Sequence, residues 1–337
     1  MNYQRHFLTW LVILGLFVRC AEGVAQEPNV ATHNPQPTPS VKLSLLVRDR
    51  ADHSVANLTK EAIEIFEDNV PQTVISLSKD QRPVDYALVI DNTGSVRPLF
   101  PQILNAAKSL IDHNNLADQT FIERFISSNK IETVQEFTSD KARLMDGLDS
   151  LYIEIGQSAV IDGIYLALRH VAEHKPGPDR RRALVVITDG DDRNSYYSEN
   201  QLMRLIRATD VQPFVIGIVD LLDNRAPLVG LSQEDKAKKL LTNLAREGGG
   251  RTYFPRNVLE VQHAVAEIVH DLHEQYMFGY ESTGGASPEN FRNIAVRISK
   301  TDGNERLTAI ARSGYFVNPP DLDSLDGEKK KNKKKPK

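Results

Sequence analysis

Residues 84–95 read VDYALVIDNTGS, a mostly apolar run that ends in a carboxylate and is followed by hydroxyl side chains. Such a run indicates a buried strand, and the carboxyl ends of strands in an open α/β sheet face a crevice where ligands bind. A loop there with Asp91, Thr93 and Ser95 offers three oxygen ligands within one turn, which suits a hard divalent cation. The alternative is a polar turn in which Thr93 or Ser95 caps the following helix.

Two further segments favour the metal site. Residues 182–190 (RALVVITDG) form a second apolar run that ends in a carboxylate, Asp189, and a glycine. Residues 156–164 (GQSAVIDGI) place Ser158 just ahead of an amphipathic stretch. Together the three segments resemble the von Willebrand factor A domain and its metal-ion-dependent adhesion site. The pattern of that family is Asp-x-Ser-x-Ser, then a distant Thr, then a distant Asp.

The resemblance implies five metal ligands in this sequence: Asp91, Thr93, Ser95, Ser158 and Asp189. Two of them depart from the family pattern, because Thr93 stands where Ser is usual and Ser158 where Thr is usual. Both exchanges keep the hydroxyl oxygen that ligation needs, while the extra methyl group of Thr93 alters the fit.

Two neighbouring acids are candidates for orienting the ligands or their waters. Asp162 follows Ser158 by one helical turn and matches a position that is often acidic in the family. Asp191 follows Asp189 closely and could tune the site, or it and Asp192 are solvated loop residues. We therefore treat Asp162 and Asp191 as candidates for holding the metal ligands or their bound waters in place.

The charge of the predicted ligand set indicates what the ion would do. Two carboxylates at most balance a divalent cation, and hydroxyl groups neutralise it little, so the ion stays attractive to a further oxygen ligand. An Asp or Glu carboxylate of a partner protein is the expected occupant. Near-octahedral oxygen ligation predicts Mg²⁺, with Mn²⁺ and Ca²⁺ as alternatives.

The amino-acid composition excludes several other classes of function. The 337 residues are 40% hydrophobic and 26% charged, as is ordinary for a globular protein with one large domain and a smaller one. The net charge of −4 gives no electrostatic basis for nucleic-acid binding. The single cysteine, Cys20, lies so near the amino terminus that a processed chain would hold no thiol, and hence no disulfide or cysteine-bound metal.

The amino terminus predicts export. Arg5 and His6 precede an apolar stretch, residues 7–18, that is short for a membrane span, and small residues follow up to Ala25. We expect a signal peptide over residues 1–25, a periplasmic, secreted or envelope-associated product, and no transmembrane span in the mature chain. A lipoprotein anchored at Cys20 and a retained membrane anchor are the alternatives.

The rest of the chain divides by its hydrophobic period. The predicted segments are a signal peptide (1–25), a linker (26–40), a β segment (41–81), a von Willebrand A domain (82–275), a second β segment (276–317) and a lysine-rich disordered tail (318–337). In the central domain we expect strands at 87–90, 121–126, 184–187 and 213–218, an antiparallel edge at 131–137, and helices at 100–113, 158–174, 199–208, 236–246 and 259–273. Alternating strands and helices predict a Rossmann-like α/β fold with a mainly parallel sheet covered on both faces.

The two β segments are predicted to form one β-sandwich-like module, because neither has enough strands for a stable core alone. The ends of a domain usually lie close together, so the α/β domain can be inserted into that module. Two independent appendages are the alternative. With residues 66–72, 275–280 and 313–316, this organisation is similar to exported bacterial proteins of the von Willebrand A type, and is nearest the acidobacterial subgroup. The lysine-rich tail is predicted to be solvated, or to touch an anionic surface.

The sequence therefore predicts an exported, non-catalytic adhesion protein. A metal-independent scaffold with a vestigial site is one alternative. A magnesium-dependent phosphatase of the haloacid dehalogenase type is another, but that chemistry needs an acid two positions after the nucleophile, where Thr93 stands. A serine hydrolase is disfavoured because Ser95 lies outside a Gly-x-Ser-x-Gly turn.

Overall fold

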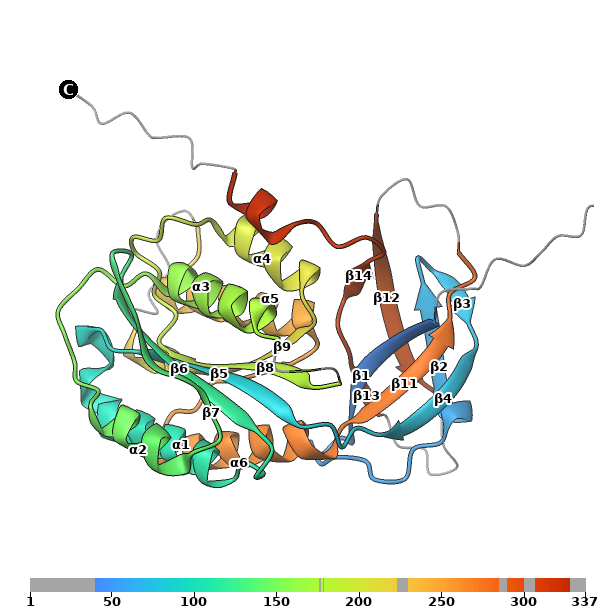
Figure 1. Ribbon diagram of the computed structural model, residues 1–337, viewed down its shortest axis with the longest axis horizontal. Helices are drawn as coiled ribbons and strands as arrows, with labels where there is room; N and C mark the ends of the chain where they lie inside the picture. The colour runs from blue at the N-terminus through green and yellow to red at the C-terminus, as the bar shows by residue number, and fades with distance from the viewer. Residues whose placement is uncertain are drawn as a thin grey trace, which may run out of the picture. The chain divides into compact units, whose positions relative to one another are not determined.

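The computed structural model describes residues 40–175, 177, 179–222, 230–284, 290–299 and 307–327 (Figure 1). The predicted signal peptide, nearly all of the predicted linker and the lysine run at the end of the chain lie outside these residues. Within them, no helix combines the length and the apolar character that crossing a lipid bilayer requires.

A six-stranded sheet forms the centre of the α/β domain. Its strands, in spatial order, are β10 (Arg251–Tyr253), β9 (Val211–Gly217), β8 (Arg181–Thr188), β5 (Val84–Asp91), β6 (Gln119–Ser127) and β7 (Lys130–Thr138). All neighbours pair in parallel except β6 and β7, which confirms the predicted antiparallel edge. Every residue of β5 is buried, as expected for a strand covered on both faces.

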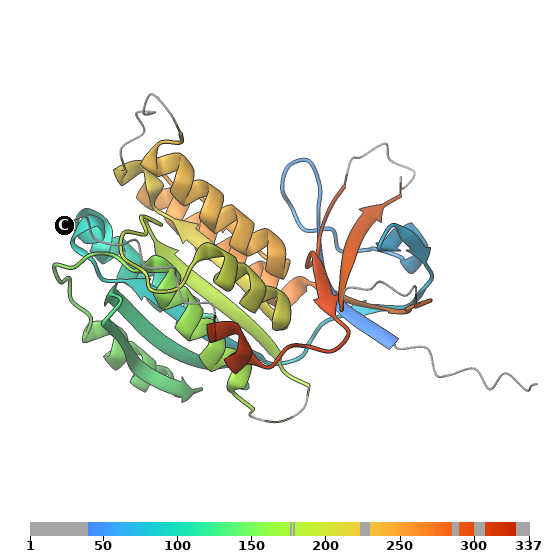
Figure 2. The same cartoon turned by 90° about the horizontal axis from the view of Figure 1, so that it is seen from above.

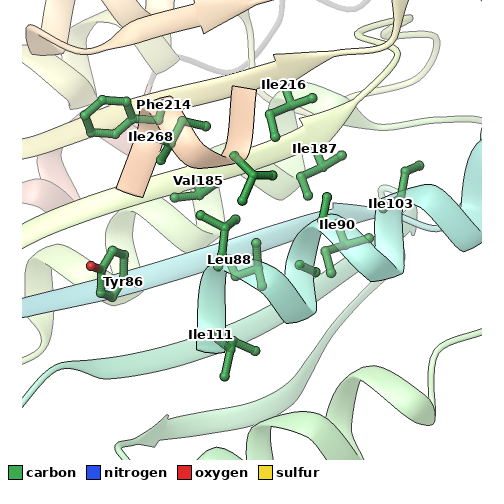
Figure 3. Close-up of a cluster of buried hydrophobic side chains, with 14 of the residues drawn as sticks. Tyr86, Leu88, Ile90, Ile103, Ile111, Val185, Ile187, Phe214, Ile216 and Ile268 are labelled. Carbon is green, nitrogen blue, oxygen red and sulfur yellow. The ribbon is translucent and has the colours of Figure 1, made fainter. Parts of the chain in front are cut away.

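Helices cover the two faces of this sheet. The helices are α1 (Phe100–Asp112), α2 (Lys141–Asp149) and α6 (Val258–Glu274) on one face, and α3 (Val160–Glu173), α4 (Glu199–Ala208) and α5 (Gln233–Gly248) on the other. Alternate residues of β5 pack into the two hydrophobic cores, one on each face of the sheet. Leu88 and Ile90 pack with α1 and α6, as Figure 3 shows, whereas Ala87 and Val89 face the side of α3. The α/β fold class is thus confirmed.

Helix α2 is absent from the sequence prediction. It has nine residues, of which only Leu144 and Leu148 are buried. One pair of apolar residues is too short a repeat to indicate a helix. Gly147 in its interior weakens the helical signal further. Its start is nevertheless well defined, because the Asp140 side chain accepts hydrogen bonds from the backbone N–H groups of Ala142 and Arg143.

The flanking segments form two four-stranded sheets. One has the order β13 (Thr308–Ile310), β1 (Ser40–Arg48), β11 (Tyr276–Glu281), β4 (Val74–Lys79); the other has β14 (Gly314–Phe316), β12 (Phe291–Ile298), β2 (Ile63–Glu67), β3 (Val70–Gln72). Each sheet contains strands from both sides of the α/β domain, and Leu45, Ile65 and Phe278 belong to one shared core. The single β-sandwich-like module is therefore confirmed.

The turn from β2 to β3 follows from the residues that form it. Asp68 and Asn69 have φ values of 48° and 67°, between paired residues Glu67 and Val70. Two consecutive left-handed residues make the turn whose twist matches an antiparallel hairpin, and Asp and Asn tolerate this conformation better than most side chains.

The sequence prediction of disorder from residue 318 onward is wrong for residues 318–327. A short helix, η4 (Leu322–Gly327), lies beside α4, and Figure 2 shows it in dark red. Leu325 is 3% exposed and belongs to the core beneath α3 and α4. The Tyr165 hydroxyl donates to Asp326 at 2.8 Å. Leu322 and Leu325 supply an apolar pair that the lysine-rich run, which begins only at Lys329, lacks.

A buried ion cluster joins the β-sandwich to the α/β domain. Arg48 at the end of β1 is 2% exposed and pairs with Asp271 and, at 2.9 Å, with Glu267, both on α6. Arg251 of β10 also bonds Asp271, at 2.9 Å. Around this cluster, Leu46 of β1 packs into the core of the α/β domain.

Removing the guanidinium of Arg48 should destabilise the protein markedly. Breaking a buried ion pair leaves an uncompensated charge and costs about 3–5 kcal/mol. We expect Arg48→Ala to lower the free energy of unfolding in urea by this amount. Arg50→Ala is the matched control, because Arg50 is exposed. Equal effects of the two substitutions would contradict the role of the cluster.

Candidate metal centre

The site begins where two neighbouring parallel strands end. In the pairing of β5 with β8, Ile90 lies opposite Ile187, so Asp91 ends β5 beside the end of β8. The Thr188 hydroxyl donates to Oδ2 of Asp91 at 2.7 Å. The strand register itself therefore brings Asp91 and Asp189 to the same edge of the sheet.

The loop after β5 holds its oxygen atoms close together. Thr93 donates to Oδ1 of Asp91 twice, from its backbone N–H at 2.9 Å and from its hydroxyl at 2.6 Å. The hydroxyl oxygens of Thr93 and Ser95 lie 2.9 Å apart. Thr93 occupies the N-cap position of η2 (Gly94–Leu99), yet its side chain makes no capping bond. The alternative of Thr93 as a helix cap is therefore wrong.

Hydrogen bonds also connect the segments that carry Ser158 and Asp189. The carbonyl oxygen of Ser158 accepts from the backbone N–H groups of Arg193 at 2.9 Å and Asn194 at 3.2 Å. Oδ1 of Asp189 accepts from the backbone N–H of Asp191 at 3.0 Å. The hydroxyl of Ser95 lies near enough to the carboxylate of Asp189 to lower its pKa, so this second loop lies beside the first.

Two buried oxygen atoms of the predicted ligands have no partner among the described residues. Oγ of Ser158 and Oδ2 of Asp189 make no hydrogen bond within the part of the chain that the structure describes. Their residues are 4% and 0% exposed. Nearly all buried polar atoms in proteins are paired, and an ion is one of the explanations for those that are not. The predicted ligands therefore fit a bound cation.

The two carboxyl groups are difficult to ionise together. Burial and the nearby charge of Asp189 raise the pKa of Asp91 to about 7, although hydrogen bonds from Thr93 and Thr188 oppose the shift. Burial likewise raises the pKa of Asp189, and the hydroxyl of Ser95 opposes it. A divalent cation between them would favour the ionised forms, because metal ligation requires deprotonated carboxylates.

Asp162 and Asp191, the two further acids of the sequence prediction, both bind protein groups close to the proposed ligands. Both carboxylate oxygens of Asp162 accept backbone hydrogen bonds, from Tyr196 at 2.7 Å and Tyr197 at 2.8 Å, so Asp162 fastens the loop after Asp189 to α3. Asp191 pairs with Arg193 at 2.6 Å. An influence of Asp162 and Asp191 on a bound ion stays a prediction.

Sequence reasoning missed two residues of this region. Thr188 holds Asp91 as described above, and its position just before Asp189 at the end of a buried strand was a usable signal. Asn92 is fully buried and ties three segments together, because its side chain donates to the carbonyl of Tyr152 and its backbone bonds Phe125 and Glu154. Nothing in the sequence distinguishes Asn92 from an ordinary loop residue.

Gly190 fixes the turn that follows Asp189. Its φ is +75°, a conformation that side chains other than glycine rarely adopt. A Cβ atom there would lie 2.9 Å from Cδ1 of Leu241 and 3.0 Å from Cβ of Ala237, both on α5. The loop thus approaches α5 more closely than any larger residue would allow.

Comparison with known proteins now identifies the domain. A family model described as the von Willebrand factor type A domain matches residues 85–268, more than half of the chain. The chain belongs to the von Willebrand factor type A domain family. Such domains are protein-interaction and adhesion modules and are generally non-catalytic.

Individual relatives of this von Willebrand factor type A protein are distant. A curated uncharacterized protein of Borreliella burgdorferi is 23% identical over 183 residues, which are 53% of this chain and 50% of that protein. Among solved structures, an aerotolerance-related membrane protein from Bacteroides fragilis is 21% identical, with a TM-score of 0.41, over 56% of this chain and 98% of that one. Proximal thread matrix protein 1 from the mussel byssus, with a zinc-occupied MIDAS motif, is 20% identical, with a TM-score of 0.46, over 60% of this chain and 48% of that one.

The raised pKa of Asp91 has a consequence for the metal-free protein. Between about pH 4 and pH 7 the folded state binds more protons at this carboxyl than the unfolded state does, so its contribution makes stability fall as pH rises. Asp91→Asn removes this contribution. In chelator, we expect the variant to gain stability relative to the wild type as pH rises through this window, measured by urea unfolding. A constant difference across the window would contradict the shift.

Proposed function

We propose that this chain is an exported, non-catalytic binding protein that captures a carboxylate of a partner protein through a divalent cation. Its ligands would be Asp91, Thr93, Ser95, Ser158 and Asp189. The observation that carries the proposal is the pair of buried, unpartnered oxygen atoms on Ser158 and Asp189. Mg²⁺ is the proposed ion, with Mn²⁺ and Ca²⁺ as alternatives, since every ligand is an oxygen atom.

The donor set supports a hydroxyl-dependent site. Among the described residues, no group of three or more His, Cys, Asp or Glu side chains is gathered as a metal ion would need. Two carboxylates and three hydroxyls would leave a bound ion able to polarise and bind one more oxygen. That is the chemistry a captured Asp or Glu side chain requires.

The surroundings of the site support a protein partner. The loops that carry the proposed ligands also expose large apolar side chains: Tyr152 and Ile155 before Ser158 are 55% and 92% exposed, and Tyr196 after Asp189 is 53% exposed. Large exposed apolar side chains that gather near a site are typical of interaction surfaces. They would pack against residues that flank the captured carboxylate.

The proposal excludes a phosphatase of the haloacid dehalogenase type on chemical grounds and places the protein outside the cytoplasm. A phosphatase would need an acid–base group two residues after Asp91, and Thr93 offers only a hydroxyl that already donates to Asp91. Export follows from the predicted signal peptide over residues 1–25. Fractionation of the native cell, with the mature amino terminus sequenced, tests this part.

Loss of one carboxylate should abolish metal binding. Substituting residues that only support metal ligands costs about 10–100-fold in affinity, so removal of a ligand should cost more than about 100-fold. We expect calorimetric titration with Mg²⁺ to show saturable binding to the wild type and none to Asp189→Asn. Asp146→Asn is the control, because Asp146 is exposed on α2. Unchanged affinity of Asp189→Asn would overturn the proposal.

The hydroxyl of Ser158 distinguishes a metal site from a vestigial one. Without metal, Ser158→Ala should keep or slightly raise stability, since it removes an unsatisfied buried polar atom. With Mg²⁺, the variant should gain less thermal stability than the wild type, because a ligand specific to the folded state stabilises in proportion to its affinity. An equal Mg²⁺-dependent rise in the unfolding temperature of both proteins would show that Ser158 is no ligand.

A further inference from the structure

A second polar site lies at the opposite end of the central sheet. It is a pocket of about 150 Å³ at the amino ends of β8 and β9, and β1 and β11 of the β-sandwich complete its wall. The metal centre lies at the carboxyl ends of β5 and β8, so the length of β8 separates the two. Six cationic side chains line the pocket: Lys42, Arg82, Arg180, Arg181, Arg182 and Arg312.

The carboxylates around the pocket do not balance these cations. Three arginines have close partners: Arg82 with Asp80 at 2.7 Å, Arg180 with Asp85 at 2.6 Å, and Arg182 with Asp210 at 2.9 Å. A fourth carboxylate, that of Asp179, lies 3.6 Å from Arg82. Six cations thus have four carboxylates within ion-pair distance, and a fifth, that of Asp118, acts on Arg181 from farther away, so the cations among the described residues are in excess.

Arg181 is the buried part of this excess. It is 7% exposed, and its Nη1 has no hydrogen-bond partner among the described residues. Its Nε donates to the carbonyl of Arg82 at 3.2 Å, and the carboxylate of Asp80 is 3.7 Å away, beyond hydrogen-bond distance. Burying a cation without a full set of partners is costly, so an anion held in the pocket beside Arg181 would stabilise its charge through space.

Arg312 and Lys42 are the two remaining cations of the pocket. The side chain of Arg312 donates only to backbone carbonyls, those of Gly314, Arg207 and Thr209. Within the described part of the chain neither Arg312 nor Lys42 has a carboxylate within ion-pair distance. Burial lowers the pKa of Arg181 and of Arg312, in each case because the charged form is desolvated. A bound anion would compensate both.

We infer that this pocket binds a phosphate group. Guanidinium groups match phosphate oxygens with paired hydrogen bonds. At neutral pH a phosphate monoester carries about −1.5 to −2 charges, more than the single charge of a carboxylate, and its three terminal oxygens can accept hydrogen bonds from several of these cations at once. The pocket is smaller than the roughly 300–1,000 Å³ of sites for drug-sized ligands, so a small anion fits it best.

Lys42 offers the sharpest test, because it is exposed and its replacement leaves the core intact. Inorganic phosphate is titrated calorimetrically into the full chain in a chloride buffer. A lost charge-assisted hydrogen bond is worth 1.5–3 kcal/mol, so we expect Lys42→Gln to weaken binding by about tenfold or more. Lys60→Gln removes the same charge from an exposed site outside the pocket and should bind as the wild type does. Equal affinities of wild type and Lys42→Gln, or no saturable binding, would overturn the inference.

Two further binding experiments distinguish phosphate binding at this pocket from binding at the metal centre, and identify the source of the phosphate. Binding in chelator, and binding by Asp189→Asn, should equal that of the wild type; a requirement for Mg²⁺ would place the anion on the metal instead. Glycerol phosphate is compared with inorganic phosphate: tighter binding of the ester indicates a phosphorylated ligand, and equal binding indicates free phosphate. Preference for acetate over both would overturn the assignment to phosphate. Phosphate binding that needs no Mg²⁺ leaves the proposed metal-dependent capture untouched, so the two proposals can fail separately.

Discussion

The parallel pairing of β5 with β8 is the constraint on which the candidate metal centre depends. One residue past the register pair Ile90 and Ile187, each strand delivers a polar residue to the same edge, and Asp189 follows at once. Two carboxyl groups are thereby buried; burial raises the pKa of both, and the charge of Asp189 raises that of Asp91 further. The core of the sheet, packed on both faces, holds them there at a cost that hydrogen bonds from Thr93 and Thr188 offset in part and that a cation or protons would offset further.

Most of the fold could be predicted because its strands and helices follow clear hydrophobic periods. The five long helices and the buried strands have apolar runs that leave one interpretation, and α4 begins and ends at the predicted residues. Short elements were missed: α2 buries one pair of leucines, and η4 depends on Leu325 in the core with Leu322 packed against it. In both, tertiary packing and not local pattern stabilises the helix.

The candidate site, like the fold, could be predicted only in part from the sequence. Asp91 and Asp189 mark the ends of apolar strands, so their proximity follows from the parallel sheet. The hydrogen bonds that fix them do not: Thr188 acts through strand register, and Asn92 through three loop contacts that no sequence spacing reveals. Asp162 was singled out for its place near Ser158, and its carboxylate proves to hold the backbone of the loop after Asp189.

The insertion of the α/β domain into the β-sandwich has a mechanical consequence. The chain enters the domain directly after β4 and leaves it directly before β11, and these two strands are antiparallel neighbours that meet at Lys79 and Tyr276. A pull on the α/β domain would therefore reach the sandwich at one end of this pair and peel its hydrogen bonds apart one after another. The ion pairs of Arg48 with Glu267 and Asp271 are a second connection between the sandwich and α6, just before Tyr276. They would bear part of the force and so protect the first hydrogen bonds between β4 and β11.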